Sequence, residues 1–75
     1  MIEIAPRITL DPATRHGRPV IKGTRVPVTT IVGHLGAGWS AERVIKEFAI
    51  TMEDMLAALQ YAARRLEEEE IHAVK

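Results

Sequence analysis

The side chains that could carry chemistry in this sequence form no catalytic pattern. The three histidines, His16, His34 and His72, are 18 and 38 residues apart, and this spacing matches no known metal site. The chain contains no cysteine, which excludes disulfides and thiolate ligands and fits a reducing compartment. Ser40 fits a helix N-cap better than a nucleophile. We therefore expect no enzymatic activity, no catalytic residue, no metal and no cofactor.

A glycine-containing segment from Gly17 to Thr24 imitates a phosphate-binding loop. It reads Gly-Arg-Pro-Val-Ile-Lys-Gly-Thr, which is a P-loop with its last lysine and glycine exchanged. A true P-loop places its lysine and hydroxyl at the start of a helix that faces the phosphates. Here Val26 and Pro27 follow instead, and nucleotide binding is excluded on that ground.

Charge divides the chain into a basic front and an acidic tail, although the formal net charge is zero. Residues 1–25 carry a formal charge of +3 and residues 51–75 a charge of −3. The cations of the front are Arg7, Arg15, Arg18, Lys22 and Arg25, and the tail includes Glu67, Glu68, Glu69 and Glu70. This asymmetry predicts two different binding faces. The alternative is that both segments are solvated surface.

The first 27 residues are expected to form extended arms. Ile8-Thr9-Leu10 and Val20-Ile21 are short β-favouring runs bounded by turn residues. They predict a loose hairpin or paired arms, joined by an ordered loop over residues 11–18.

Three helices are expected in residues 28–70. Pro27 suits the entry to the first helix, and Gly36 and Gly38 suit its exit. Ser40 is the expected N-cap of a second helix over residues 41–48. Thr51 and Asp54 imitate a capping box before a third helix over residues 52–70. Residues 71–75 remain as a tail, and residues 1–75 form a single, mainly α domain.

The third helix carries more apolar surface than two short neighbours can cover. Its larger apolar residues are Met52, Met55, Leu56, Leu59 and Leu66, and four alanines widen that surface. A chain of 75 residues also builds only a small core of its own. Both observations predict packing against a second copy, as a homodimer. The alternative is that alanine is simply a good helix former on an exposed face.

The second and third helices have the proportions of a helix-turn-helix, with the turn at Ala49 and Ile50. In that motif the first residues of the second helix reach base edges, which makes Thr51 and Glu53 candidate contacts to duplex DNA. The candidate phosphate contacts are Arg15, Arg18, Lys22 and Arg25. Glu53 repels phosphates, so nucleic acid and protein are comparable as targets.

Residues 17–28, Gly-Arg-Pro-Val-Ile-Lys-Gly-Thr-Arg-Val-Pro-Val, resemble the small bacterial and archaeal proteins of domain-of-unknown-function family 433. The resemblance covers about residues 8 to 63, and the Gly-Thr-Arg-Val-Pro-Val core is its most specific part. Such proteins are often described as antitoxin-like, of the VapB type. The resemblance implies a homeodomain-like three-helix bundle with N-terminal arms, usually dimeric, encoded beside a PIN-like ribonuclease toxin. Many relatives have proline in the turn where this chain has Ala49.

Two functions are expected from these features. The first is an antitoxin-like regulator that binds operator DNA through the arms and the helix-turn-helix. Its acidic end, Glu67, Glu68, Glu69 and Glu70, would then contact the toxin. The second is a protein–protein interaction module, a dimeric adaptor that never touches DNA.

The first ten residues are not a signal-peptide core, and the longest weakly polar stretch, residues 31–39, is too short to cross a bilayer. We therefore expect a cytoplasmic protein with no membrane contact.

Overall fold

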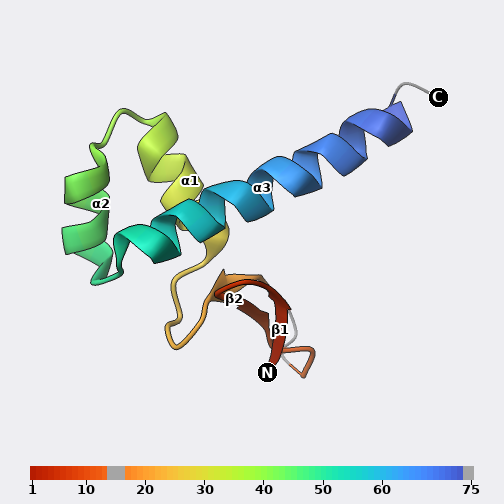
Figure 1. Ribbon diagram of the computed structural model, residues 1–75, viewed down its shortest axis with the longest axis horizontal. Coiled ribbons are helices and arrows are strands. Elements are labelled where there is room, and N and C mark those ends of the chain that lie inside the picture. Colours follow the sequence, from red (N-terminus) through yellow and green to blue (C-terminus); the bar gives the residue numbers. More distant parts are fainter. Residues whose placement is uncertain (14–16, 74–75) are drawn as a thin grey trace.

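Three strands and three helices form the fold in the computed structural model, which describes residues 1–13 and 17–73. The elements are β1 (Ile2–Ala5), β2 (Ile8–Leu10), β3 (Val20–Ile21), α1 (Val28–Gly36), α2 (Ala41–Phe48) and α3 (Met52–Ala73). The long α3 crosses the molecule, with the sheet below it and α1 and α2 above its N-terminal half (Figure 1). The expectation of a mainly α domain with N-terminal strands is confirmed.

The sheet is antiparallel, in the order β1-β2-β3. The expected pairing of the two β-favouring runs is present, with Ile8 opposite Ile21. The additional strand β1 was not expected from the sequence, and it pairs Ile2 with Leu10 and Ala5 with Ile8. The two-residue turn between β1 and β2 ends at Arg7, whose φ of 65° lies in the left-handed region.

The helices begin where the local signals predict. Pro27, with φ −66° and ψ 146°, occupies the N-cap of α1. The Ser40 hydroxyl accepts a hydrogen bond from the Arg43 amide at 3.1 Å and so caps α2. Gly38, with φ +99°, follows the end of α1, and Ala49 ends α2 with φ 52°. A left-handed alanine is strained because its Cβ crowds the carbonyl group.

One core joins the sheet to all three helices. Ile8, Ile21, Ile31 and Val44 have no exposed surface, and they come from β2, β3, α1 and α2. Val28, Ile50, Met55 and Ala58 complete this buried cluster. The helices therefore fix the sheet, and with it the segments that flank β3, as one body.

Helix α3 is longer than expected and its apolar residues do not share one face. It continues to Ala73, so residues 71–73, expected in the tail, are helical, while residues 74–75 lie outside the described part. Met55 and Ala58 are buried, and Ala57 and Ala62 pack against the same core. Most of the alanine surface expected to face a second copy therefore covers the chain's own core.

In the described residues, no helix combines the length and apolar character needed to cross a membrane.

Candidate nucleic-acid interface

The turn after β3 is held by its own hydrogen bonds, and Arg25 follows it directly. The Ile21 amide donates to the Val26 carbonyl at 3.0 Å. The Thr24 hydroxyl donates to the Ile21 carbonyl at 2.8 Å and accepts from the Val26 amide at 3.0 Å. Gly23 adopts φ +78°, which favours glycine. Thr24 thus bonds locally to the turn, and these bonds fix the backbone on both sides of Arg25.

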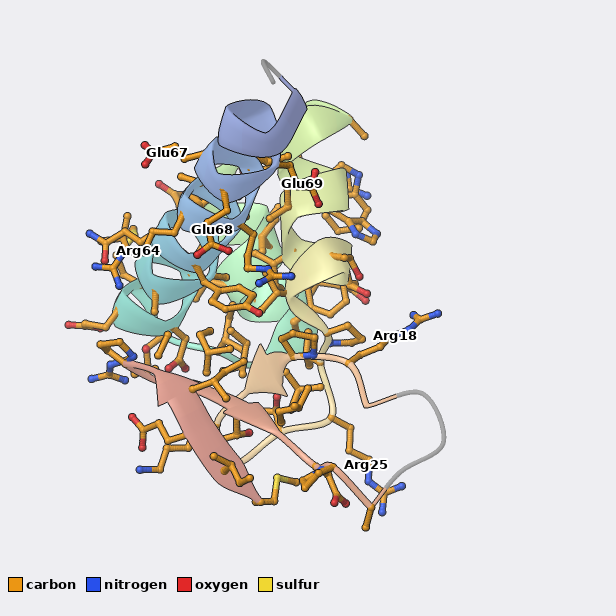
Figure 2. The ribbon with its side chains drawn as sticks, turned by 90° about the vertical axis from the view of Figure 1, so that its right-hand side faces the viewer. Arg18, Arg25, Arg64, Glu67, Glu68 and Glu69 are labelled. Atoms are coloured by element: carbon orange, nitrogen blue, oxygen red, sulfur yellow. The ribbon has the colours of Figure 1, made fainter. Side chains whose placement is uncertain are left out.

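Arg18 and Arg25 come together on one face of the molecule. Both are exposed, and both border a hollow of about 460 Å³ that Asp11, Val20 and Pro27 also line. Within the described part of the chain neither arginine takes part in an ion pair. Figure 2 shows Arg18 extending away from the helices on the side of the molecule opposite to Arg64 and Glu67. Two exposed guanidinium groups that border one hollow, and that take part in no ion pair in the described part, suit contacts to separate phosphates of a nucleic-acid backbone.

The remaining basic candidates of the front differ from these two. The Lys22 ammonium lies 2.9 Å from a Glu3 carboxylate oxygen. The backbone amide of Lys22 donates a hydrogen bond to the Arg7 carbonyl at 2.8 Å. The bond from Lys22, together with one from the Arg7 amide, lowers the pKa of Glu3 below its ordinary value. A phosphate that binds Lys22 must compete with this carboxylate. Arg15 lies outside the described residues.

The start of α3 is occupied by a complete capping box. The Thr51 amide donates to Asp54 Oδ2, and the Asp54 amide donates to Thr51 Oγ1, both at 3.0 Å. Arg7 Nη1 contacts Asp54 Oδ1 at 3.1 Å and so joins the β1–β2 turn to α3. Partial burial acts to raise the pKa of Asp54, but the bonds from Thr51 and Arg7 outweigh it and hold the pKa below the ordinary value. Thr51 is thus used in the cap, while Glu53 is exposed beside it.

An aromatic cluster between α1 and α2 was not expected from the sequence. The His34 ring meets Trp39 and Phe48 edge-on, at centroid distances of 4.5 and 5.1 Å. His34 Nδ1 lies 2.7 Å from the Thr30 carbonyl oxygen, so the ring is held by packing and by its own helix. The Arg43 guanidinium stacks 3.6 Å from the centroid of the Trp39 ring. The cluster packs α1 against α2, and the Arg43 guanidinium is engaged by the Trp39 ring.

The acidic candidates lie near the far end of α3. Glu67, Glu68 and Glu69 are exposed, and Glu68 pairs with Arg65 at 3.2 Å. The side chain of Glu70 lies outside the described part. The structure therefore places Glu67 and Glu68 apart from Arg18 and Arg25 (Figure 2). Among the described residues, no group of histidine and acidic side chains could hold a metal ion.

These features define a small, mainly helical domain with an N-terminal sheet, in which two exposed arginines flank β3. A family model described as "Protein of unknown function (DUF433)" matches residues 8–62, well over half of the chain. The protein belongs to this family. No curated protein and no solved structure matches it.

Proposed function

We propose that this protein is an antitoxin-type regulator that binds duplex DNA, with the Arg18–Arg25 face as its phosphate contact. The observation that supports this most is the placement of two exposed arginines around one hollow, where each is free of ion pairs among the described residues. Phosphate contacts supply most of the affinity in such complexes, and they fix the position of the protein on the duplex.

The α2–α3 pair supplies the second part of the proposal. A short capped helix, a turn at Ala49 and Ile50, and a capped α3 have the proportions of a helix-turn-helix. In this interpretation Glu53, exposed at the start of α3, accepts a hydrogen bond from a cytosine amine. Thr51 shapes the helix start, because its hydroxyl and amide are both used in the capping box.

The proposed partners are a second copy of the chain and a toxin of the PIN-like ribonuclease type. The exposed acids Glu67, Glu68 and Glu69 point to a basic surface on that toxin, such as the one a ribonuclease uses to hold RNA. Because these acids and the two arginines are on different parts of the surface, both partners can bind at once.

The test uses fluorescence anisotropy with duplex DNA from upstream of the gene, at several salt concentrations. Each phosphate contact contributes about −0.9 to the slope of log K against log salt, so Arg18→Gln and Arg25→Gln should each reduce that slope by about 0.9. Lys46→Gln is the control for the loss of one positive charge, since Lys46 on α2 is also exposed and without an ion pair in the described part. An equal loss in all three variants would show that only net charge matters, and would reject this face as the contact.

A protein-binding module without DNA affinity is the second candidate function. Glu53 and Asp54 give the start of α3 negative charge, and Met52, Leu56 and Leu66 leave apolar surface on the same helix exposed. These features suit a protein partner better than a phosphate backbone. If the wild-type protein binds no duplex at low salt while its circular dichroism shows a folded state, this candidate replaces the first.

A further inference from the structure

Helix α3 has a second apolar face that its own chain leaves uncovered. The exposed fractions of Met52, Leu56 and Leu66 are 44 %, 49 % and 58 %. Ala63 is also exposed, and Leu59 is half-buried. These five residues, which we call the α3 seam, run directly beside the buried side of the helix: at about 100° per residue, the middle of the seam is turned by roughly a quarter-turn from Met55 and Ala58, which are buried in the core. The C-terminal half of α3 projects beyond the sheet and α1 (Figure 1).

The spacing of the α3 seam is that of a coiled coil. Its residues, at positions 52, 56, 59, 63 and 66, follow one another at steps of four, three, four and three. This average of 3.5 residues is the period at which two helices keep one stripe in contact along their length. The partner that such a stripe fits is therefore another helix with an apolar stripe.

The α3 seam also fits the seam of a second copy that runs in the opposite direction. When two copies run antiparallel about residue 61, Leu56 faces Leu66 of the second copy and Leu59 faces the small Ala63. Both of these kinds of layer contain leucine, and the layers nearest the axis pair a large side chain with a small one, as close packing requires. Met52 has no seam residue opposite it in this register. We infer that the α3 seam binds the α3 seam of a second copy in this antiparallel register.

Charge favours the antiparallel direction. A parallel pair would place the two acidic runs, Glu67 to Glu69, side by side, whereas the antiparallel pair moves them to opposite ends. The antiparallel pair does bring Glu67 towards Glu53 of the second copy. Arg64, three residues before Glu67 on the helix surface and without an ion pair in the described part, supplies positive charge at this point.

A hollow beside the α3 seam extends the same surface. It has a volume of about 760 Å³ and lies between α1 and α3, where Val32, Gly33, Tyr61 and Leu66 line it. Leu66 belongs to both the hollow and the seam, so a helix on the seam covers one edge of the hollow. A contact limited to one helix per copy falls at the low end of specific interfaces, about 1,200 Å² in total or less. We therefore expect a dimer that dissociates at micromolar concentrations.

Sedimentation equilibrium over a range of micromolar concentrations tests the interface. Leu56→Gln and Leu66→Gln should each raise the dissociation constant about tenfold or more, because a symmetric dimer loses the side chain twice. Ile2→Gln is the matched control, since Ile2 on the edge strand β1 is 52 % exposed. A wild-type protein that stays monomeric throughout, or an Ile2→Gln variant that dissociates as much as the leucine variants, would overturn the inference.

Cysteine pairing tests the register, and the chain has no cysteine of its own. An equimolar mixture of Leu56→Cys and Leu66→Cys proteins should form the mixed disulfide on mild oxidation. The positions face each other in the antiparallel pair, whereas identical positions are about 15 Å apart along the helix and too far to bridge. Disulfides between identical variants in place of the mixed product would show a parallel pair and reject the register.

This inference deepens the homodimer of the proposed function, but its test contains no DNA. A protein that dimerises through α3 and binds no duplex would retain the inference and lose the regulator. A monomer that binds the upstream duplex would do the reverse.

Discussion

Replacing Asp54 with alanine should destabilise the domain by about 1.5 kcal/mol. The substitution removes the carboxylate that accepts the Thr51 amide, and loss of such a cap costs about 1 kcal/mol. It also removes the contact with Arg7, whose side chain is 50 % exposed, so this pair contributes only about 0.2–1 kcal/mol. For a chain of this size the loss corresponds to a fall of about 6–12 °C in Tm.

The assay is thermal unfolding followed by circular dichroism, with Arg7→Gln as the companion variant. Asp54→Asn should cost less than Asp54→Ala, since its amide oxygen can still accept the Thr51 amide. In the double variant Arg7→Gln/Asp54→Ala, the loss of stability should be smaller than the sum of the losses in the two single variants, because each substitution removes the same ion pair. Strict additivity, or an Asp54→Ala variant as stable as the wild type, would refute the assignment of Asp54 as the link between sheet and helix.

The same carboxylate gives the stability a pH dependence of known sign. The pKa of Asp54 is lower in the folded state, so its contribution is present above the unfolded value of about 4 and is lost as the pH falls through the folded pKa. Glu3, with its pKa lowered by Lys22, acts in the same direction. The Tm difference between wild type and Asp54→Ala should therefore shrink as the pH is lowered below about 4. A difference that grows in acid would contradict this sign.

Substitutions at three further positions test the local structure by urea unfolding. Thr9→Val should leave the stability unchanged or raise it by up to about 1 kcal/mol, because the Thr9 hydroxyl is buried without a hydrogen-bond partner among the described residues. A loss of stability above about 1 kcal/mol would show that the hydroxyl has a partner. Ala49→Gly should stabilise by up to about 1 kcal/mol, because glycine relieves the strain of φ 52°, and a destabilised variant would argue against the left-handed turn. Ser40→Ala should cost about 1 kcal/mol through the lost cap of α2, whereas Ser40→Asp should cost little; equal losses would exclude capping.

The helix starts could be predicted because their signals are local. Pro27, Ser40 and the pair Thr51 and Asp54 each act within three or four residues of the helix start that they determine. Strand β1 depends instead on its pairing with β2 and carries only four residues, two of them exposed isoleucines. A pattern this short cannot be told from an irregular arm before its neighbour is known.

The sequence alone could not tell the buried face of α3 from the exposed one, because residues of both faces alternate within one short segment. Met52, Met55 and Leu56 are close in sequence, yet Met55 points into the core and the other two remain exposed. Which face becomes the core is decided by where α1 and the sheet pack. The step pattern of the α3 seam was present in the sequence, but it overlaps the ordinary helical period of the buried face.

For the candidate site, residue types could be predicted but not their pairing. Arg15, Arg18, Lys22 and Arg25 were expected to act together because they are basic residues close in the sequence. The contact between Lys22 and Glu3 spans 19 residues and that between Arg7 and Asp54 spans 47. Such distant pairs depend on the assembled sheet and helices, so only the structure separates Arg18 and Arg25 from the cations that are already engaged.

The proposal of a DNA-binding regulator rests most directly on whether the wild-type protein distinguishes its own upstream duplex from a scrambled duplex of equal length. Fluorescence anisotropy of both duplexes, at the same two salt concentrations, measures this. The account predicts saturable and tighter binding to the upstream duplex, with an affinity that falls as salt is raised. Equal, strongly salt-dependent binding to both duplexes would contradict it, since a basic face alone would then explain the affinity.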